Sequence, residues 1–210
     1  MDDALGHSIT VPGIGRTSRQ PDVADVTVTV DMTAKTAVAA QSGASERAHK
    51  VLAALTEAGI APTDVATRGI SLDAVYDYRE NEARLTGYRS SQTLGVRVCR
   101  IETLGPVIDA VITAGATGIA SVSLGLSDPS TAEKEARAAA LADARERAQT
   151  LARAGDVMLG RLLAVVEGSP SGGAPRPMMR MKAEMMAADT PVAEGSTEVV
   201  IQVVASFAIE

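Results

Sequence analysis

Aromatic side chains are almost absent from this sequence. They make up 2% of the 210 residues, with no Trp, three Tyr and one Phe. A folded core must therefore be built from aliphatic side chains. Proteins that bind single-stranded nucleic acid usually stack the bases on aromatic rings. The net charge of -6, without a basic run, also gives little attraction for phosphates. The composition therefore argues against a nucleic-acid partner.

Cysteine and histidine are equally scarce. The single Cys99 excludes an internal disulfide, and we expect it to lie half-buried in a strand without a catalytic role. The histidines, His7 and His49, are too few for a zinc or iron site. Neither lies beside a nucleophile motif, so a Ser-His-Asp system is not indicated. The sequence predicts no catalytic residue, no metal site and no cofactor, and we expect a protein that is not an enzyme.

Long apolar runs are missing as well. No stretch approaches the roughly 20 apolar residues that a transmembrane helix requires. The acidic start, MDDALGHSITVPG, lacks the apolar segment of a signal peptide. As written, the chain is therefore expected to be cytoplasmic. A periplasmic or cell-envelope location stays open if a signal has been removed.

One glycine pair looks like a ligand-binding motif but lacks its context. Gly13-Ile14-Gly15 begins as a dinucleotide-binding turn would, yet position 18 is Ser and no helix signal follows. We expect a turn at the end of a strand. The chain also has no phosphate-binding loop and no nucleophile elbow.

Hydrophobic periodicity is the strongest signal that the sequence does carry. Alternation predicts strands, and spacing by threes and fours predicts helices. A third helix is expected between Asp128 and Gly155, with Leu141, Ala144, Ala148 and Leu151 as its apolar stripe. The predicted strands lie near residues 9–19, 26–32, 65–78, 85–100, 122–126, 160–167 and 199–209, and the other helices near 37–58 and 104–112.

Residues from about Val23 to Leu126 thus follow the strand–helix–strand–strand–helix–strand order of a ferredoxin-like βαββαβ core. We expect an α+β fold in which a long helix and two C-terminal strands extend this core. Helices should cover one face of a single, largely antiparallel sheet. The whole chain, 1–210, is predicted to be one domain. Because its long strands have apolar faces that need covering, we expect self-association.

Two segments are candidate interfaces. The stretch 168–195, rich in Pro, Gly and Met, is expected to be a loop. Its methionines could pack on a partner, hold a soft metal such as Cu(I), or belong to a low-complexity loop. The tip of the predicted hairpin, with its tyrosines, is either a solvated turn or a contact surface, and the second interpretation rests on the enrichment of tyrosine in interfaces. The candidate residues are Met178, Met179, Met181, Met185, Met186, Tyr76 and Tyr78.

Four segments are distinctive in combination: ITVPGIGRTSRQPDVADVTVTV, GYRSSQTLGVRV, AGATGIASVSLGLSD and ALADARERAQTLARAGD. Together they resemble the SIMPL-domain (DUF541) family of 26 kDa periplasmic immunogen-like proteins. The resemblance implies an α+β SIMPL fold, ring-like homo-oligomers and links to the cell envelope, stress tolerance or signalling scaffolds. It carries over no catalytic residue. Two functions remain: a non-enzymatic self-assembling scaffold or hollow particle, and a stress protein that binds a small molecule or soft metal through the Met-rich loop.

Overall fold

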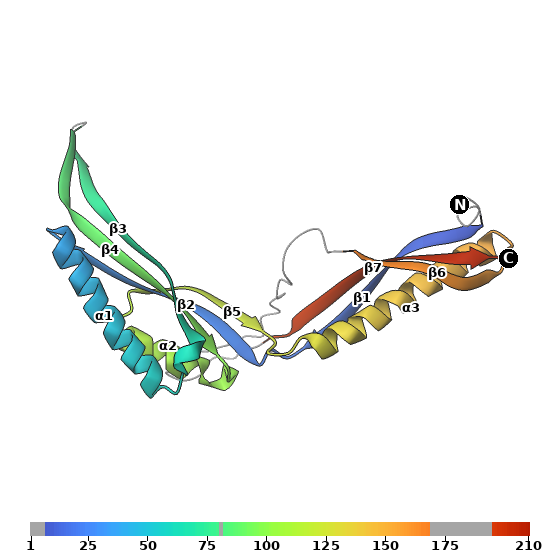
Figure 1. Cartoon of the computed structure of the whole chain (residues 1–210), viewed down its shortest axis with the longest axis horizontal. Coiled ribbons are helices and arrows are strands. Elements are labelled where there is room, and N and C mark those ends of the chain that lie inside the picture. The colour runs from blue at the N-terminus through green and yellow to red at the C-terminus, as the bar shows by residue number, and fades with distance from the viewer. Residues whose placement is uncertain (1–6, 80–81, 169–194) are drawn as a thin grey trace. The chain divides into compact units, whose positions relative to one another are not determined.

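A computed structural model describes residues 7–79, 82–168 and 195–210. Helices and antiparallel sheets confirm the α+β class (Figure 1). The described residues form two compact units, each taken by itself below. The strands are β1 (Ser8–Arg19), β2 (Val23–Ala34), β3 (Val65–Arg79), β4 (Glu82–Val98), β5 (Gly118–Gly125), β6 (Leu159–Gly168) and β7 (Thr197–Ile209), and the α-helices are α1 (Ala37–Glu57), α2 (Leu104–Thr113) and α3 (Ser130–Ala154).

Unit 2, residues 21–79 and 82–127, is the predicted ferredoxin-like core. Its sheet has the order β3-β4-β2-β5, and every neighbouring pair is antiparallel. Alternate β2 residues, Val26, Val28 and Val30, are buried against the apolar sides of α1 and α2. Asp22 joins the two ends of the unit: its N–H donates to Gly125 O at 3.0 Å, and its carboxylate accepts from the Ser127 N–H at 2.7 Å.

Unit 1, residues 7–20, 128–168 and 195–210, has a sheet of its own in the order β1-β7-β6. The expectation of one sheet is therefore wrong. The first strand pairs with the last along its whole length, from Ser8 with Ala208 to Arg19 with Thr197. Periodicity identifies a strand but not its partner, so the sequence placed the C-terminal strands on the wrong sheet. The prediction of one domain over 1–210 stays a prediction.

Helix α3 covers this second sheet with a stripe made only of alanine. Every fourth residue is buried, and the stripe consists of Ala132, Ala136, Ala140, Ala144, Ala148 and Ala152. The predicted stripe is right for Ala144 and Ala148 but wrong for Leu151, which is 52% exposed, while Leu141 is only partly buried. The buried positions are taken by alanine because the helix backbone lies too close to the sheet for a larger side chain, so Leu141 packs only at the margin of the core.

That close approach explains Gly13 and Gly15, which the sequence analysis wrongly assigned to a turn. Both lie within β1 and are buried. A Cβ atom added at Gly13 would lie 2.1 Å from the carbonyl oxygen of Ala140, and one at Gly15 would lie 1.8 Å from that of Ala136. The glycines are thus required for space. Between them, the Ile14 N–H donates to Asp143 Oδ2 at 2.8 Å.

Candidate functional site: a hairpin arm and its polar base

The β3–β4 hairpin extends past the start of α1 (Figure 1). Beyond that point it carries apolar side chains that are exposed. We call residues 70–79 and 82–90 the hairpin arm. The predicted contact residue Tyr76 lies on it, 48% exposed, and its ladder partner Leu85 is 46% exposed. Ile70 and Leu72 are also exposed. These four large apolar residues form the most concentrated uncovered group of unit 2.

Of the other predicted interface residues, Tyr78 pairs with Ala83 in the strand ladder. The five methionines, Met178, Met179, Met181, Met185 and Met186, lie outside the described residues. The sequence analysis missed Ile70, Leu72 and Leu85. Their alternation is ordinary for a half-buried strand. The exposure of these three side chains becomes visible only from where α1 begins, because no described helix or strand covers them.

A buried polar seam lies under the base of the arm, where α1 packs on β4. Ser90 has no exposed surface, and its hydroxyl donates to Gln41 Oε1 at 2.8 Å. Beside it, Gln92 Nε2 donates to Ser45 Oγ at 3.2 Å. Buried polar groups without partners are costly, so these hydrogen bonds favour one register of the helix on the strand.

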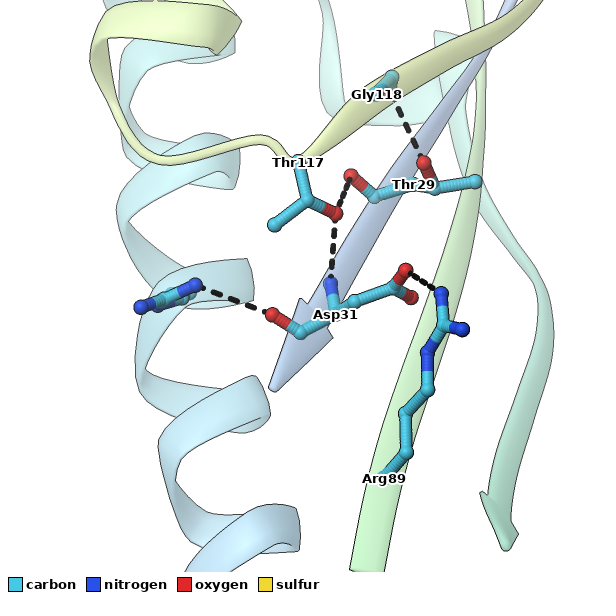
Figure 2. A network of polar contacts seen from close by, with 6 residues as sticks. Thr29, Asp31, Arg89, Thr117 and Gly118 are labelled. Carbon is cyan, nitrogen blue, oxygen red and sulfur yellow. Dashed lines mark hydrogen bonds and ion pairs between the residues drawn. The ribbon is translucent and has the colours of Figure 1, made fainter. Parts of the chain in front are cut away.

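A second polar cluster, the Asp31 clasp, ties β2 to three other parts of unit 2 (Figure 2). The Asp31 carboxylate forms an ion pair with Arg89 of the arm. Its N–H donates to Thr117 Oγ1 at 2.9 Å, and its carbonyl accepts from Arg47 of α1 at 3.1 Å. The Thr29 hydroxyl donates to Gly118 O at 3.1 Å. The clasp thus joins the arm, α1 and the start of β5.

The clasp makes Asp31 a stronger acid. Its pKa lies below the ordinary value because the Ser91 hydroxyl and the Arg89 guanidinium favour the carboxylate, while burial works in the opposite direction. A lowered folded-state pKa stabilises the fold above the unfolded-state pKa of about 3.9. That contribution disappears as the pH falls through the lower, folded-state pKa.

We therefore expect Asp31→Asn to lower the free energy of unfolding by about 0.5–1 kcal/mol at pH 7, as for other partly exposed ion pairs. The difference from the parent should shrink below about pH 4. Urea unfolding of both proteins at pH 7 and in acid measures it. Asp25→Asn, at an exposed carboxylate of the same strand, is the matched control. A deficit that stays constant with pH would contradict the role of the ion pair.

Among the shallow pockets of unit 2, one of about 440 Å³ is lined in part by polar and charged side chains: Asp25, Thr27, Asp64, Arg68 and Arg97. Its two carboxylates and two guanidinium groups balance in charge, so it favours neither an anion nor a cation. Cys99 lies next to it. This cysteine follows β4 and is exposed, which corrects the half-buried strand position that we expected.

The surroundings of Cys99 do not resemble those of a reactive thiol. Its Sγ lies 3.7 Å from Asp64 Oδ2. Reactive thiolates are promoted by cationic neighbours, and this neighbour is an acid. Across the described ranges, no three His, Cys, Asp or Glu side chains are grouped as metal ligands would be. In the same residues, no helix combines the length and apolarity that crossing a membrane requires.

Comparison with known proteins gives one family and several relatives. Residues 9–207 match the family described as "SIMPL: Protein of unknown function (DUF541)". The 26 kDa periplasmic immunogenic protein of Brucella melitensis is 35% identical over 214 residues, which cover 96% of this chain and 84% of that protein. The uncharacterized protein YggE of Escherichia coli K12 is 32% identical over 192 residues, covering 91% and 76%. The likeness therefore includes both units.

Proposed function

The chain belongs to the SIMPL (DUF541) family, and on that premise we propose that it is a non-enzymatic, self-assembling protein. It forms a ring-like or hollow homo-oligomer linked to the cell envelope or to stress tolerance. The name of the Brucella relatives, which places those proteins in the periplasm, supports the envelope link. No catalytic group enters the proposal, because the polar clusters of unit 2 are engaged in joining its elements.

The observation that carries the proposal is the apolar hairpin arm. Isolated exposed apolar residues are normal, but contiguous ones mark interaction sites. Tyr76 and Leu85 are directly paired across the two strands. Tyrosine is also enriched in the cores of interfaces. The polar seam and the Asp31 clasp fix the base of the arm, so burying it against another copy orders few additional groups.

We expect light scattering to give a particle mass well above 21.6 kDa that persists on dilution. Tyr76→Lys combined with Leu85→Lys should reduce that mass, because two charges would have to leave water at the interface. Circular dichroism should stay unchanged, since both side chains are already about half exposed.

Ile112→Lys is the matched control, because Ile112 is 52% exposed on α2 and lies away from the arm in sequence and element. Its particle mass should equal that of the parent. A parent of 21.6 kDa at all concentrations would refute self-assembly. A large parent whose mass the double variant leaves unchanged would remove the arm from the interface.

A further inference from the structure

The charged pocket of about 440 Å³ lies on the face of the unit 2 sheet that is turned away from the helices. Because Val26 of β2 is buried against α1 and α2, its neighbours Asp25 and Thr27 lie on the opposite face. Their register partners on β4 are Arg97 and Gly95, and all four of these residues line the pocket. The sheet itself is therefore the floor of the pocket, and the two inner strands supply part of its charge.

Two irregularities of the sheet flank this pocket. The ladder of β3 with β4 passes from Thr67 to Gly69, which leaves Arg68 as the extra residue of a β-bulge. On the other side, the ladder of β2 with β5 shifts its register next to Thr27. Bulges redirect side chains and are over-represented next to active sites. The first of these two bulges directs the side chain of Arg68 across the neighbouring strand.

Gly95 leaves the space in which Arg68 lies. A Cβ atom added at Gly95 would be 2.6 Å from Arg68 Nε and 3.2 Å from Arg68 Cγ. The Arg68 side chain thus lies over the glycine at the floor of the pocket. Arg97 begins two residues further along β4 on the same face, about 7 Å away at 3.3–3.4 Å per residue. The two guanidinium groups can therefore reach the same carboxylate.

The charged groups of the pocket do not neutralise one another. Asp25 and Arg97 are register partners, but in the described part of the chain the guanidinium groups of Arg68 and Arg97 form neither an ion pair nor a hydrogen bond. Asp31 and Arg89, further along the same two strands, are paired with each other. The sheet therefore allows ion pairs of this kind, and the charges of the pocket are available to a ligand.

From these contacts we propose that the pocket binds a small zwitterion with one carboxylate and one ammonium group, an amino acid or a short peptide. Arg68 and Arg97 hold the carboxylate, because the planar guanidinium group forms two parallel hydrogen bonds with it. Asp25 and Asp64, on the walls of the same pocket, hold the ammonium group. The volume also fits, since ligand pockets measure about 300–1,000 Å³. This binding activity goes beyond the proposed self-assembly and does not depend on it.

Isothermal titration calorimetry with dialanine tests the ligand class. Two analogues keep one charge each: N-acetyl-dialanine lacks the ammonium group, and dialanine amide lacks the carboxylate. We expect the protein to bind dialanine, and to bind each analogue about tenfold more weakly or worse, because a charged group of the pocket then has no partner. A parallel titration with alanine distinguishes an amino acid from a peptide as the preferred ligand.

Two outcomes of the titrations would overturn the proposal. One is the absence of heat from both dialanine and alanine at about 10 mM, which is ten times a Kd of about 1 mM. The other is equal binding of dialanine and its two analogues, because that would show contact without recognition of charge.

Gly95→Ala tests the position of Arg68 without changing any charge. The added Cβ meets a flexible side chain, which can turn away, so the circular dichroism spectrum should stay unchanged while Arg68 leaves the pocket floor. We expect binding of dialanine to weaken by about tenfold. Gly125→Ala is the matched control, because its Cβ makes only an ordinary contact of 3.8 Å with Val23 and Gly125 does not line the pocket.

Arg97→Gln should also weaken dialanine binding by about tenfold, because it removes one of the two cations. Its control is Lys35→Gln, which removes a positive charge at an exposed position outside the pocket. If Gly95→Ala and Arg97→Gln bind dialanine as the parent does, the ligand lies elsewhere and the pocket is refuted. The particle mass is a separate measurement: a monomeric protein that binds dialanine through Arg97 refutes self-assembly and supports this site.

Discussion

Gly15→Ala is expected to lower the free energy of unfolding by about 3 kcal/mol or more, the upper range for overpacked positions. The added Cβ would lie 1.8 Å from the carbonyl oxygen of Ala136 and 2.5 Å from the backbone nitrogen of Ala140. Both are backbone atoms of α3, so no side-chain rotation relieves the overlap. The helix must move off the sheet, and that movement opens the alanine stripe to water.

Urea unfolding followed by circular dichroism measures the loss. Gly69→Ala is the matched control, because a Cβ at that strand position meets no atom within 4 Å. It should change stability by less than about 1 kcal/mol. Equal effects of the two substitutions would mean that the contact between β1 and α3 is not as close as described.

Phe207→Ala is expected to lower the free energy of unfolding by about 3–5 kcal/mol, as for other fully buried Phe residues. Phe207 has no exposed surface and is the largest side chain in the core of unit 1. Its neighbours include Ala140, Ala144 and Ala205. These side chains are too short to fill the cavity that the missing ring leaves.

Thermal and urea unfolding measure this effect. Val204→Ala is the matched control on the same strand, because its side chain is 44% exposed on the opposite face. It should lower stability by less than about 1 kcal/mol. A small loss for Phe207→Ala would show that unit 1 can collapse around the missing ring.

Local patterns predicted the elements well and their partners less well. The alternation of Val26, Val28 and Val30 identified β2, and the βαββαβ order followed from the sequence of elements alone. The local sequence does not reveal that residues 8–19 pair with residues 197–209, because any strand with alternating apolar residues could pair with residues 8–19. Local patterns therefore predicted the core of unit 2 and did not predict the separate sheet of unit 1.

The errors in packing have one physical source. Leucine is more apolar than alanine, so Leu151 was expected to be buried and was found exposed. How close two backbones come decides which side chain fits, and here β1 and α3 are too close for leucine. The short distance between the two backbones depends on the glycines of β1, Gly13 and Gly15, together with the alanines of α3. It cannot be inferred from either element alone.

The candidate site was predicted only in part. Tyr76 could be singled out because it lies near the tip of a predicted hairpin and tyrosine is enriched in interfaces. The exposure of Ile70 and Leu72 depends on where α1 begins relative to the hairpin, which periodicity does not give. The Asp31 clasp likewise joins residues from β2, α1, β4 and the start of β5, which are far apart in the sequence.

Pairing of β1 with β7 sets an order of events during synthesis of the chain. Ser8 can pair only after Ala208 has been made, whereas every described helix and strand of unit 2 has been made once synthesis reaches Ser127. At about 5–20 residues per second, β1 is translated on the order of ten seconds before its partner strand. The described elements of unit 2 can therefore fold on the ribosome while β1 still has no partner strand. The pairing of β1 with β7, which completes the sheet of unit 1, takes place only when the whole polypeptide has been made.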